Sequence, residues 1–567
     1  MSKKILIIGG VAGGASCAAR LRRLDEEAEI ILFERGPYVS FANCGLPYHV
    51  GSVIPKRANL LVVTPDLLRQ RFRIDIRTLQ EVVQIDRASR EVRVNDLGTG
   101  RTYTEGYDYL VIATGAAPVQ PPFPGGDLPG VFTLRTIPDT DSIISWIDER
   151  QIKDAVIIGA GYIGLEMADN LQQRGLAVSV VELQDQVLAG TMDYEMAAIV
   201  QGYLRQQGVE LCLGDRVQEI RQAGDRLLIR TDRRNLPAGL VLVSTGLRPE
   251  TALARASGLE LGPTGGIRTD SFLHTSDPLI YAVGDVIEVT NPVSKSPALI
   301  PLAGPANRQG RLAADNICGR QLPYRGTVGT SIIKLFSLAA AATGLNARQL
   351  QERRIPYRSI IVHPLARASY YPGGSQISLK LLFSPDDGRI LGTQVIGQEG
   401  VDKRIDVLAT ALQAGQTVYD LEQLELAYAP PFSSARDPVN ILGMAAANIM
   451  RGDVAAVGWE DVESLMKDGA LLLDVRTPSE VEAGIIAGST HIPVDELRQR
   501  LGEIPAGRRL VVHCASGLRS YIACRILKAH GWNEVYNLSG GYRTYRTAVA
   551  ERSRLSKPEL QNIMAGG

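Results

Sequence analysis

The stretch KKILIIGGVAGGASCAARLRRL, residues 3–24, decides the fold of the N-terminal part of the chain. An apolar run ends in glycines and a helical pattern follows, so the stretch predicts a buried strand, a turn and a helix. A second strand, AEIILFER, ends near Glu34. This order is typical of a βαβ nucleotide unit, in which glycines let the backbone approach a pyrophosphate and an acidic residue binds a ribose. The candidate turn glycines are Gly9, Gly13 and Gly14.

Val11 stands where the middle glycine of GxGxxG is usual, so a glycine turn without a ligand stays open for this first copy. A second copy, DAVIIGAGYIGLEMADNLQQRGLAVSVVELQD, residues 154–185, has the complete motif. Glu182 ends its second strand, where a carboxylate would bind a ribose 2′-hydroxyl and repel a 2′-phosphate, which favours NADH over NADPH. The glycines of this motif are Gly159, Gly161 and Gly164.

Two further strands end in glycine turns: YDYLVIATGAAPVQPP and HTSDPLIYAVGDVIE. Each alone is equally consistent with an ordinary strand end. The order of all four segments resembles the two-dinucleotide-domain flavoprotein disulfide reductases over about residues 1–325. The resemblance implies FAD at the first unit, a nicotinamide cofactor at the second, and a return of the later segments to the flavin, with Asp285 at its ribityl chain. The residues implied are Thr114, Gly115, Gly284 and Asp285.

The composition is that of a globular protein of several domains. The chain has 567 residues, with 61 basic and 61 acidic side chains, and about 150 residues per domain suggests three to four domains. A net charge of zero favours neither nucleic acid nor an anionic membrane as a partner. The chain has no apolar run near the roughly 20 residues of a membrane span, and its six cysteines follow no disulfide or zinc spacing, so we expect a cytoplasmic protein without a metal.

The segment SFANCGLPY places Cys44 in the first unit without a second cysteine nearby. Many flavoprotein disulfide reductases carry two cysteines separated by four residues, but His49 takes the second place here. A single thiolate must cycle through an outside partner, as a mixed disulfide, a persulfide or a sulfenic acid. The segment resembles the single-cysteine branch, which includes coenzyme A-disulfide reductases, persulfide reductases, and NADH enzymes that reduce peroxide or oxygen.

The resemblance continues in ASYYPGG, GVDKRIDV and LAYAPPFSSARDPVN, which look like the C-terminal dimerisation domain of that family. It implies a homodimer in which Tyr370 and Tyr428 approach Cys44 of the partner subunit as proton donors or positioners; interface packing alone is the alternative. A coenzyme A site needs arginine or lysine around its phosphates. The residues implied for it are Arg20, Arg23, Ser40, Asn43, Asn307 and Arg436. A solvated basic helix face is the alternative for Arg20 and Arg23, and Phe72 replaces a familiar basic position.

The last part of the chain begins a new α/β pattern that resembles a rhodanese domain. Its central signal is CASGLR, a strand ending at Cys514 and a loop through Arg519 that leads into a helix. Such a loop turns backbone N–H groups inward and stabilises a thiolate or persulfide anion, which suits sulfane-sulfur transfer. Phosphatase chemistry is the alternative, because related folds with a longer loop take phosphate.

We therefore expect an α/β fold with two interleaved Rossmann-like dinucleotide-binding domains, an α+β dimerisation domain and a C-terminal α/β rhodanese domain. The expected function is NADH-dependent reduction of coenzyme A persulfide, polysulfide or coenzyme A disulfide through a mixed disulfide on Cys44, with sulfane sulfur relayed by Cys514. The alternatives are an NADH oxidase or peroxidase with a passenger domain, and a tail that is a non-catalytic sulfur carrier or docking module. The expected boundaries are 1–115 and 246–325 for FAD, 116–245 for NADH, 326–450 for dimerisation and 455–567 for rhodanese.

Overall fold

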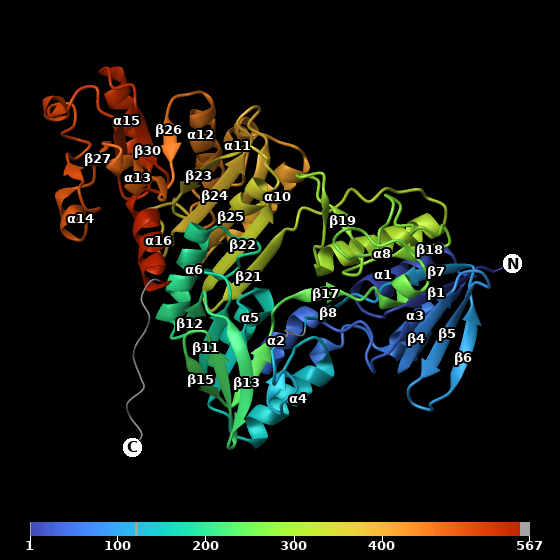
Figure 1. Ribbon diagram of the computed structural model, residues 1–567. Helices are drawn as coiled ribbons and strands as arrows, with labels where there is room; N and C mark the ends of the chain where they lie inside the picture. The colour runs from blue at the N-terminus through green and yellow to red at the C-terminus, as the bar shows by residue number, and fades with distance from the viewer. Residues whose placement is uncertain (1, 120–122, 556–567) are drawn as a thin grey trace. The chain divides into compact units, whose positions relative to one another are not determined.

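The computed structural model describes residues 2–119 and 123–555 (Figure 1). The chain forms two compact units: Met1–Val181 with Arg216–Gly329, and Glu182–Asp215 with Thr330–Gly567. Parallel sheets with helices between their strands occur in both, so the α/β class expected from the sequence is confirmed. In the described part of the chain, no helix combines the length and apolar character needed to traverse a lipid bilayer.

The first unit contains a five-stranded parallel sheet built around the N-terminal strand. Because β1 (Lys4–Ile8) is buried along nearly its whole length, its sequence is a continuous apolar run rather than an alternating one. The strand order is β18 (Ile280–Ala282), β7 (Tyr109–Ile112), β1 (Lys4–Ile8), β2 (Glu29–Glu34) and β3 (Asp75–Thr78). The helices near it are α1 (Ala12–Leu24), α3 (Pro65–Phe72), α7 (Ala252–Ala256) and α8 (Ala303–Ile317).

The second parallel sheet of this unit repeats the pattern. Its strands run in the order β12 (Glu210–Leu213), β11 (Ala177–Glu182), β10 (Asp154–Ile158), β16 (Leu240–Val243) and β9 (Val131–Phe132). Helices α4 (Ile137–Glu149) and α5 (Tyr162–Gln173) accompany it, and the short α2 (Leu46–Val50) packs against both. Small antiparallel groups complete the unit: β4 (Gln80–Asp86), β5 (Glu91–Asp96) and β6 (Thr102–Gly106); β13 (Val217–Ala223), β14 (Arg226–Thr231) and β15 (Asn235–Ala238); β8 (Ala116–Pro118) with β17 (Leu247–Pro249); β19 (Val289–Thr290) with β20 (Pro297–Ala298).

The second unit holds an antiparallel sheet and a third parallel one. The antiparallel order is β21 (Ser331–Leu335), β22 (Leu338–Gly344), β25 (Ile390–Gly397), β24 (Ile377–Phe383) and β23 (Arg358–Val362), with α9 (Ala347–Glu352), α10 (Val401–Gln413), α11 (Val418–Gln423) and α12 (Pro438–Met450). The parallel order is β26 (Ala455–Val457), β30 (Val535–Leu538), β29 (Leu510–His513), β27 (Leu471–Asp474) and β28 (Thr490–His491), with α13 (Asp461–Lys467), α14 (Pro478–Glu482), α15 (Leu518–Ala529) and α16 (Gly541–Leu555).

The C-terminal α/β part is anchored within this unit by its last helix and by a buried histidine. Glu551 of α16 accepts hydrogen bonds from Gln201 (3.4 Å) and Arg205 (3.3 Å), which both lie on α6 (Tyr194–Gln206). His363, next to β23, contacts the Thr544 hydroxyl of α16 at 2.8 Å through Nε2. The C-terminal part is therefore packed against its own unit through both polar and helical contacts.

Arg404 on α10 holds together the two loops that carry Tyr370 and Tyr428. Its guanidinium is buried, with 1% of the residue exposed, and donates to the Asp437 carboxylate at 2.9 Å. It also donates to the Ala366 carbonyl at 2.8 Å and to the Ser433 hydroxyl at 3.2 Å. One buried cation thus satisfies acceptors from two loops far apart in sequence.

Replacing Arg404 by methionine should lower the free energy of unfolding by about 3 kcal/mol, because the buried Asp437 carboxylate loses its nearest cation and keeps only Lys403, at 3.4 Å, as an ionic partner. Urea unfolding followed by circular dichroism measures the change. The matched control is Arg451→Met, which removes an exposed guanidinium bound to Glu422 and should leave the transition nearly unchanged. Equal effects of the two variants would contradict the anchoring role of Arg404.

Candidate functional site

Three strand ends meet at one edge of the first parallel sheet. Strands β18, β7 and β1 are neighbours and run parallel, so their carboxyl ends lie together. These ends carry Gly284 with Asp285, Thr114 with Gly115, and the glycine turn that begins at Gly9. The segments that the sequence singled out separately therefore converge on one site, at the edge where open α/β sheets bind ligands.

The glycine turn after β1 leaves no room for side chains. Gly9 has φ of +104°, and a Cβ there would lie 2.2 Å from the Ala113 carbonyl oxygen. A Cβ on Gly14 would lie 1.9 Å from the Gly9 carbonyl oxygen, and one on Gly13 would lie 3.0 Å from Val283. The start of α1 is thus held against β1, with its free N–H groups at the strand ends.

The polar groups at this edge suit a dinucleotide. Glu34, at the end of β2, accepts hydrogen bonds from the backbone N–H groups of Gly10 (2.9 Å) and Gly36 (2.8 Å), and burial raises the pKa of its carboxyl. Burial also raises the pKa of Asp285, whose carboxyl has no hydrogen-bond partner among the described residues. A partly buried carboxyl without a partner is suited to receive a ligand hydroxyl, so the residues fit FAD.

The remaining residues at this edge have backbone roles. Gly115 has φ of +73°, and the Thr114 hydroxyl donates to the Glu250 carbonyl at 2.9 Å. Gly284 has φ of +84° and donates its N–H to the Gln309 side chain at 2.7 Å. Both glycines therefore occupy positions that other residues adopt only with strain.

The second glycine turn follows β10 and has the same construction. Gly159 has φ of +108°, and a Cβ on Gly164 would lie 2.0 Å from the Gly159 carbonyl oxygen. Gly161, by contrast, has an ordinary φ of −80° and no heavy atom within 4 Å of an added Cβ. The protein itself does not require glycine at position 161, so we predict that the open space beside it serves the approach of a ligand. Glu182 is the last residue of β11, and its carboxylate accepts from the Gln184 N–H at 2.8 Å.

Cys44 is an exposed free thiol in the 3-10 turn Asn43–Gly45, directly before α2. Burial of part of its surroundings and the charges of Glu166 and Asp285 raise the pKa of this thiol. Because Asp285 belongs to the first sheet's edge, its effect on Cys44 links the thiol to the predicted flavin site. Asn43 is exposed beside it.

Glu166 on α5 is a residue that the sequence analysis did not single out. The Tyr48 hydroxyl, one helical turn after Cys44, donates to its carboxylate at 3.2 Å. Burial raises the pKa of Glu166 to about 7, a shift that the Tyr48 hydrogen bond opposes and the Asp169 charge increases. The sequence offers one signal that could have identified Glu166: it is the single charged residue in an otherwise apolar helix turn, two residues after Gly164.

A cavity of about 330 Å³ opens beside α1 and α8. It is lined by apolar side chains that include Phe72, Val63 and Leu68, and by the predicted residues Arg23, Ser40 and Asn307. Arg311, which the sequence analysis did not name, lines it as well. Neither arginine has a carboxylate partner among the described residues, so both cations are available to an anionic ligand.

Arg20 does not line this cavity. Its guanidinium donates to the buried Asp315 carboxylate at 2.7 Å, and Arg320 binds the same group at 3.2 Å. The one-turn spacing of Arg20 and Arg23 predicts that both lie on one face of α1. The ion pair with Asp315 instead places the Arg20 guanidinium in the contact between α1 and α8. The proposed phosphate contact of Arg20 stays a prediction.

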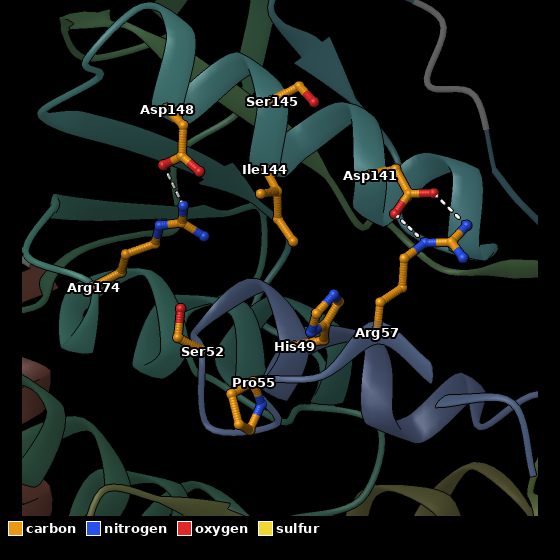
Figure 2. A pocket seen from close by; sticks show the side chains of 9 residues that line it. All are labelled: His49, Ser52, Pro55, Arg57, Asp141, Ile144, Ser145, Asp148 and Arg174. Carbon is orange, nitrogen blue, oxygen red and sulfur yellow. Dashed lines mark hydrogen bonds and ion pairs between the residues drawn. The ribbon is translucent and has the colours of Figure 1, made fainter. Parts of the chain in front are cut away.

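A second cavity, of about 340 Å³, lies near His49 and is bordered by ion pairs (Figure 2). Arg57 donates to Asp141 of α4 at 2.7 Å through two nitrogens, and Arg174 binds Asp148. Arg174 also donates to the Val50 carbonyl at the end of α2, at 2.7 Å. These ion pairs hold the segment after Cys44 against α4, so we assign the residues around this cavity a structural role in fixing α2.

Tyr370 and Tyr428 form a pair in the second unit. Their hydroxyl oxygens lie 2.6 Å apart, and the residues are 72% and 46% exposed. Arg436 is exposed on the loop that follows Tyr428, and Phe432 of that loop is also 72% exposed. Aromatic surface of this extent is typical of an interaction face.

Cys514 lies at the end of β29 in a loop that supplies hydrogen bonds to its sulfur. Gly517, with φ of +107°, donates its N–H to Sγ at 3.1 Å, and the Ser520 hydroxyl donates at 3.4 Å. Such donors at the N-terminus of α15 stabilise a sulfur anion. Arg519 donates to both Glu480 oxygens at 2.7 Å, and this pairing holds the pKa of Glu480 near 2.

These features define a two-dinucleotide α/β enzyme with an appended sulfur-binding loop domain. The model of the family "Pyridine nucleotide-disulphide oxidoreductase" matches residues 3–310, that of its dimerisation domain matches residues 330–439, and that of the rhodanese-like domain matches residues 459–548. The chain belongs to the pyridine nucleotide-disulphide oxidoreductase family, whose members use FAD and a pyridine nucleotide. The resemblance stated from the sequence is confirmed.

Three similar proteins cover most of this chain. The reduced Bacillus anthracis CoADR-RHD structure is 46% identical with a TM-score of 0.95, covering 97% of this chain and 99% of that one. A NAD-dependent persulfide reductase from A. fulgidus is 38% identical with a TM-score of 0.90, covering 96% and 100%. A coenzyme A disulfide reductase of Staphylococcus haemolyticus is 33% identical over 448 residues, covering 79% of this chain and 100% of the relative.

Two glycine variants test the nicotinamide site. Gly164→Ala should destabilise the protein by about 1–3 kcal/mol, because its Cβ would overlap the Gly159 carbonyl. Gly161→Ala should leave stability unchanged but raise the Kd for NADH about tenfold, because the added methyl group faces only the ligand's space. Thermal unfolding and calorimetric titration with NADH measure the two effects, and unchanged NADH binding in Gly161→Ala would contradict this placement.

Glu166→Gln should lower the pKa of Cys44 in the holoenzyme. The Glu166 carboxylate contributes to the raised pKa of the thiol, so removing its charge moves the formation of thiolate to lower pH. The rate of Cys44 alkylation by iodoacetamide against pH gives the inflection. Glu260→Gln, at an exposed pair with Arg268, is the control and should leave the inflection in place. An inflection that does not move in Glu166→Gln would contradict the coupling.

Proposed function

We propose that the protein is an NADH-dependent reductase of coenzyme A persulfide, related polysulfides or coenzyme A disulfide. One observation carries the proposal: Cys44 is an exposed free thiol, and Ser40, four residues before it in the chain, lines a cavity. The same cavity is lined by two arginines without carboxylate partners among the described residues. A thiol without a protein partner needs a thiol ligand, and the cations of Arg23 and Arg311 suit the phosphates of coenzyme A. The names of the relatives agree with this substrate class.

The apolar wall of the cavity supports the same ligand. Phe72, Val63 and Leu68 would contact the uncharged pantetheine arm, while Asn307 and Ser40 offer hydrogen bonds to its amides. Phe72 stands at the position where a basic residue was expected, and Arg311 supplies a positive charge to the same cavity. We therefore keep the substrate residues predicted from the sequence and add Arg311 to them. Arg20 is proposed to act only indirectly, through its ion pair with Asp315 on α8.

In the proposed reaction, the Cys44 thiolate attacks the sulfur–sulfur bond of the substrate. With coenzyme A persulfide, a Cys44–coenzyme A mixed disulfide forms and hydrosulfide leaves; with the disulfide, coenzyme A thiolate leaves. Cleavage of the mixed disulfide takes up two electrons and one proton and returns the Cys44 thiolate and coenzyme A. FAD, when bound, supplies the electron transfer from NADH for this step.

The residues of this chain have distinct parts in that reaction. Gly9, Gly13, Gly14, Glu34 and Asp285 would hold FAD, and Glu182 would bind the NADH ribose. Glu166 and Asp285 keep negative charge near Cys44, which favours departure of an anion from its mixed disulfide. Tyr370 and Tyr428, hydrogen bonded to each other, are proposed to approach Cys44 of the partner subunit in a homodimer and to deliver the proton to the departing coenzyme A sulfur.

The C-terminal domain is proposed to collect sulfane sulfur on Cys514 and to pass it to coenzyme A. The N–H of Gly517 and the hydroxyl of Ser520 stabilise the persulfide anion, and Arg519, fixed by Glu480, shapes the loop. Cys44 and Cys514 are both free thiols, which fits a reducing compartment such as the cytoplasm.

Two cysteine variants separate the parts of the proposal. Cys44→Ser should abolish NADH-dependent reduction of coenzyme A disulfide and persulfide while flavin absorbance persists, because no thiolate remains to form the mixed disulfide. Cys514→Ala should leave disulfide reduction within about twofold but prevent sulfur loading of the C-terminal domain. Steady-state NADH oxidation and intact-protein mass spectrometry measure the two activities.

Cys318→Ser is the control for the loss of a thiol and should resemble the parent in both assays. Parent enzyme that consumes NADH faster with oxygen or peroxide than with either coenzyme A substrate would overturn the proposal in favour of an oxidase or peroxidase. Reduction that continues at the parent rate in Cys44→Ser would overturn the role of Cys44.

A further inference from the structure

The end of the Cys514 loop is held by a side chain from the neighbouring strand. Asn537 lies on β30, in register with Val512 of β29, and only 6% of it is exposed. Its amide Nδ2 donates to the Gly517 carbonyl at 3.2 Å, while its Oδ1 is buried without a hydrogen-bond partner among the described residues. An unsatisfied buried acceptor destabilises a fold, so the donation by Nδ2 is the feature of this amide that needs a reason.

The Gly517 carbonyl has a second donor, the Ser520 hydroxyl, and that hydroxyl also faces the sulfur. Ser520 is fully buried on α15. Its Oγ lies 3.1 Å from the Gly517 carbonyl oxygen and 3.4 Å from Cys514 Sγ. A serine hydroxyl has a single hydrogen, so it donates to one of these two acceptors at a time. The carbonyl and the sulfur therefore compete for the same hydrogen.

The amide of Asn537 settles this competition in favour of the sulfur. Because the amide already pairs with the Gly517 carbonyl, that carbonyl stays hydrogen bonded when the hydroxyl turns to the sulfur. A sulfur anion also gains more from a hydrogen bond than a neutral carbonyl does. Without the amide, the Ser520 hydroxyl would have to satisfy the carbonyl, and the sulfur would keep the Gly517 N–H, at 3.1 Å, as its donor.

The first part of the loop is fixed independently of Asn537. Tyr542 donates its backbone N–H to the Cys514 carbonyl at 2.8 Å, and Arg543 donates its N–H to the Ala515 carbonyl at 3.1 Å. Both donors belong to the backbone of α16. A substitution at position 537 therefore acts on the far end of the loop and leaves the anchoring of the thiol's own peptide in place.

The other titratable groups around the thiol keep their charge state near neutral pH. Burial lowers the pKa of His513, on β29, to about 4, so its imidazole is neutral there. Burial raises the pKa of Cys524, on α15, to about 12, and the charge of Cys514 adds to this shift, so Cys524 stays protonated. The charged side chains near the loop are paired with each other, Arg519 with Glu480 and Arg476 with Asp474, or belong to an arginine that never loses its proton, Arg543. A pH profile of the loop's reactivity near neutral pH thus reports Cys514 itself.

We propose that Asn537 is a positioning residue: by holding the Gly517 carbonyl, its amide frees the Ser520 hydroxyl to donate its hydrogen to the Cys514 thiolate. The inference deepens the proposed function, in which that thiolate collects sulfane sulfur, and rests on it. With two donors instead of one, the anion is favoured over the thiol.

The test compares the parent holoenzyme with Asn537→Leu and Asn537→Ala. Both variants lack the amide but differ in size, so an equal effect assigns it to the amide and not to packing. The probe is thiosulfate, whose outer sulfur bonds to the thiolate as sulfite leaves, and mass spectrometry follows sulfur on the Cys514 peptide at each pH. The inflection of the loading rate should move to higher pH in both variants, and the rate below the inflection should fall about fivefold, as expected for the loss of one hydrogen bond.

The variant Ser520→Ala supplies the background that identifies the route. On its own it should lower the loading rate about as much as Asn537→Leu does, because both changes deprive the sulfur of the same donor. In the Ser520→Ala background, Asn537→Leu should then have no further effect. A merely structural role of the amide would instead lower the rate in both backgrounds.

The matched control is Ser539→Ala. Ser539 lies two residues after Asn537 and is also 6% exposed, and its hydroxyl accepts from the Ile361 N–H at 2.9 Å. Its loss removes another buried polar contact of the same segment. Because this contact leads away from the Cys514 loop, the inflection should stay at the parent pH.

The outcomes separate this inference from the proposed function. Loading of Asn537→Leu with the parent pH profile would overturn the positioning role while leaving the sulfur relay standing. An equal loss in the parent and Ser520→Ala backgrounds would also overturn it, because the amide would then act by another route. Parent protein that gains no sulfur at Cys514 would overturn the relay and the positioning role together.

Discussion

The structure depends on the close backbone contact between the start of α1 and the end of β1. With only 1.9 Å between a Cβ on Gly14 and the Gly9 carbonyl oxygen, the helix can approach the strand end only if position 14 lacks a side chain. This contact directs the N-terminus of α1 at the ends of β1, β7 and β18, where Asp285 lies. It also fixes the face of α1 that bears Arg23 toward the cavity beside α8. One steric constraint thus positions both the predicted cofactor site and the predicted substrate site.

The two candidate thiols lie in opposite electrostatic surroundings. Burial and two carboxylates raise the pKa of Cys44, whereas an N–H group and a hydroxyl point at the sulfur of Cys514. A negative environment favours release of an anion from a mixed disulfide, and inward-pointing donors favour retention of a persulfide anion. These settings agree with one thiol that turns over in reduction and another that holds sulfur for transfer.

Much of the fold was predictable because its signals are local. Glycine turns between apolar strands and helices mark the nucleotide units, and CASGLR marks the sulfur-binding loop, since each pattern lies within a short stretch of chain. What the sequence could not show was pairing between distant residues. Arg20 lies one turn from Arg23, yet Asp315, far along the chain, draws it out of the cavity. Glu166 and Arg311 were missed for the same reason, because their importance comes from Tyr48 and from the cavity wall.

The C-terminal domain is joined to its unit by contacts that do not depend on pH in the physiological range. The pKa of His363 is lowered to about 3, so its hydrogen bonds to Ser378 and Thr544 are those of a neutral imidazole throughout that range. Tyr194 of α6 stacks on Trp459 with ring centres 5.7 Å apart, and Arg552 lies over both rings. Because α16 carries contacts to α6 at one end and to the Cys514 loop at the other, the sulfur-binding loop is built on the same helix that anchors the domain. A displacement of this domain would disturb that loop, so transfer by a mobile small thiol requires less rearrangement than transfer by movement of the domain.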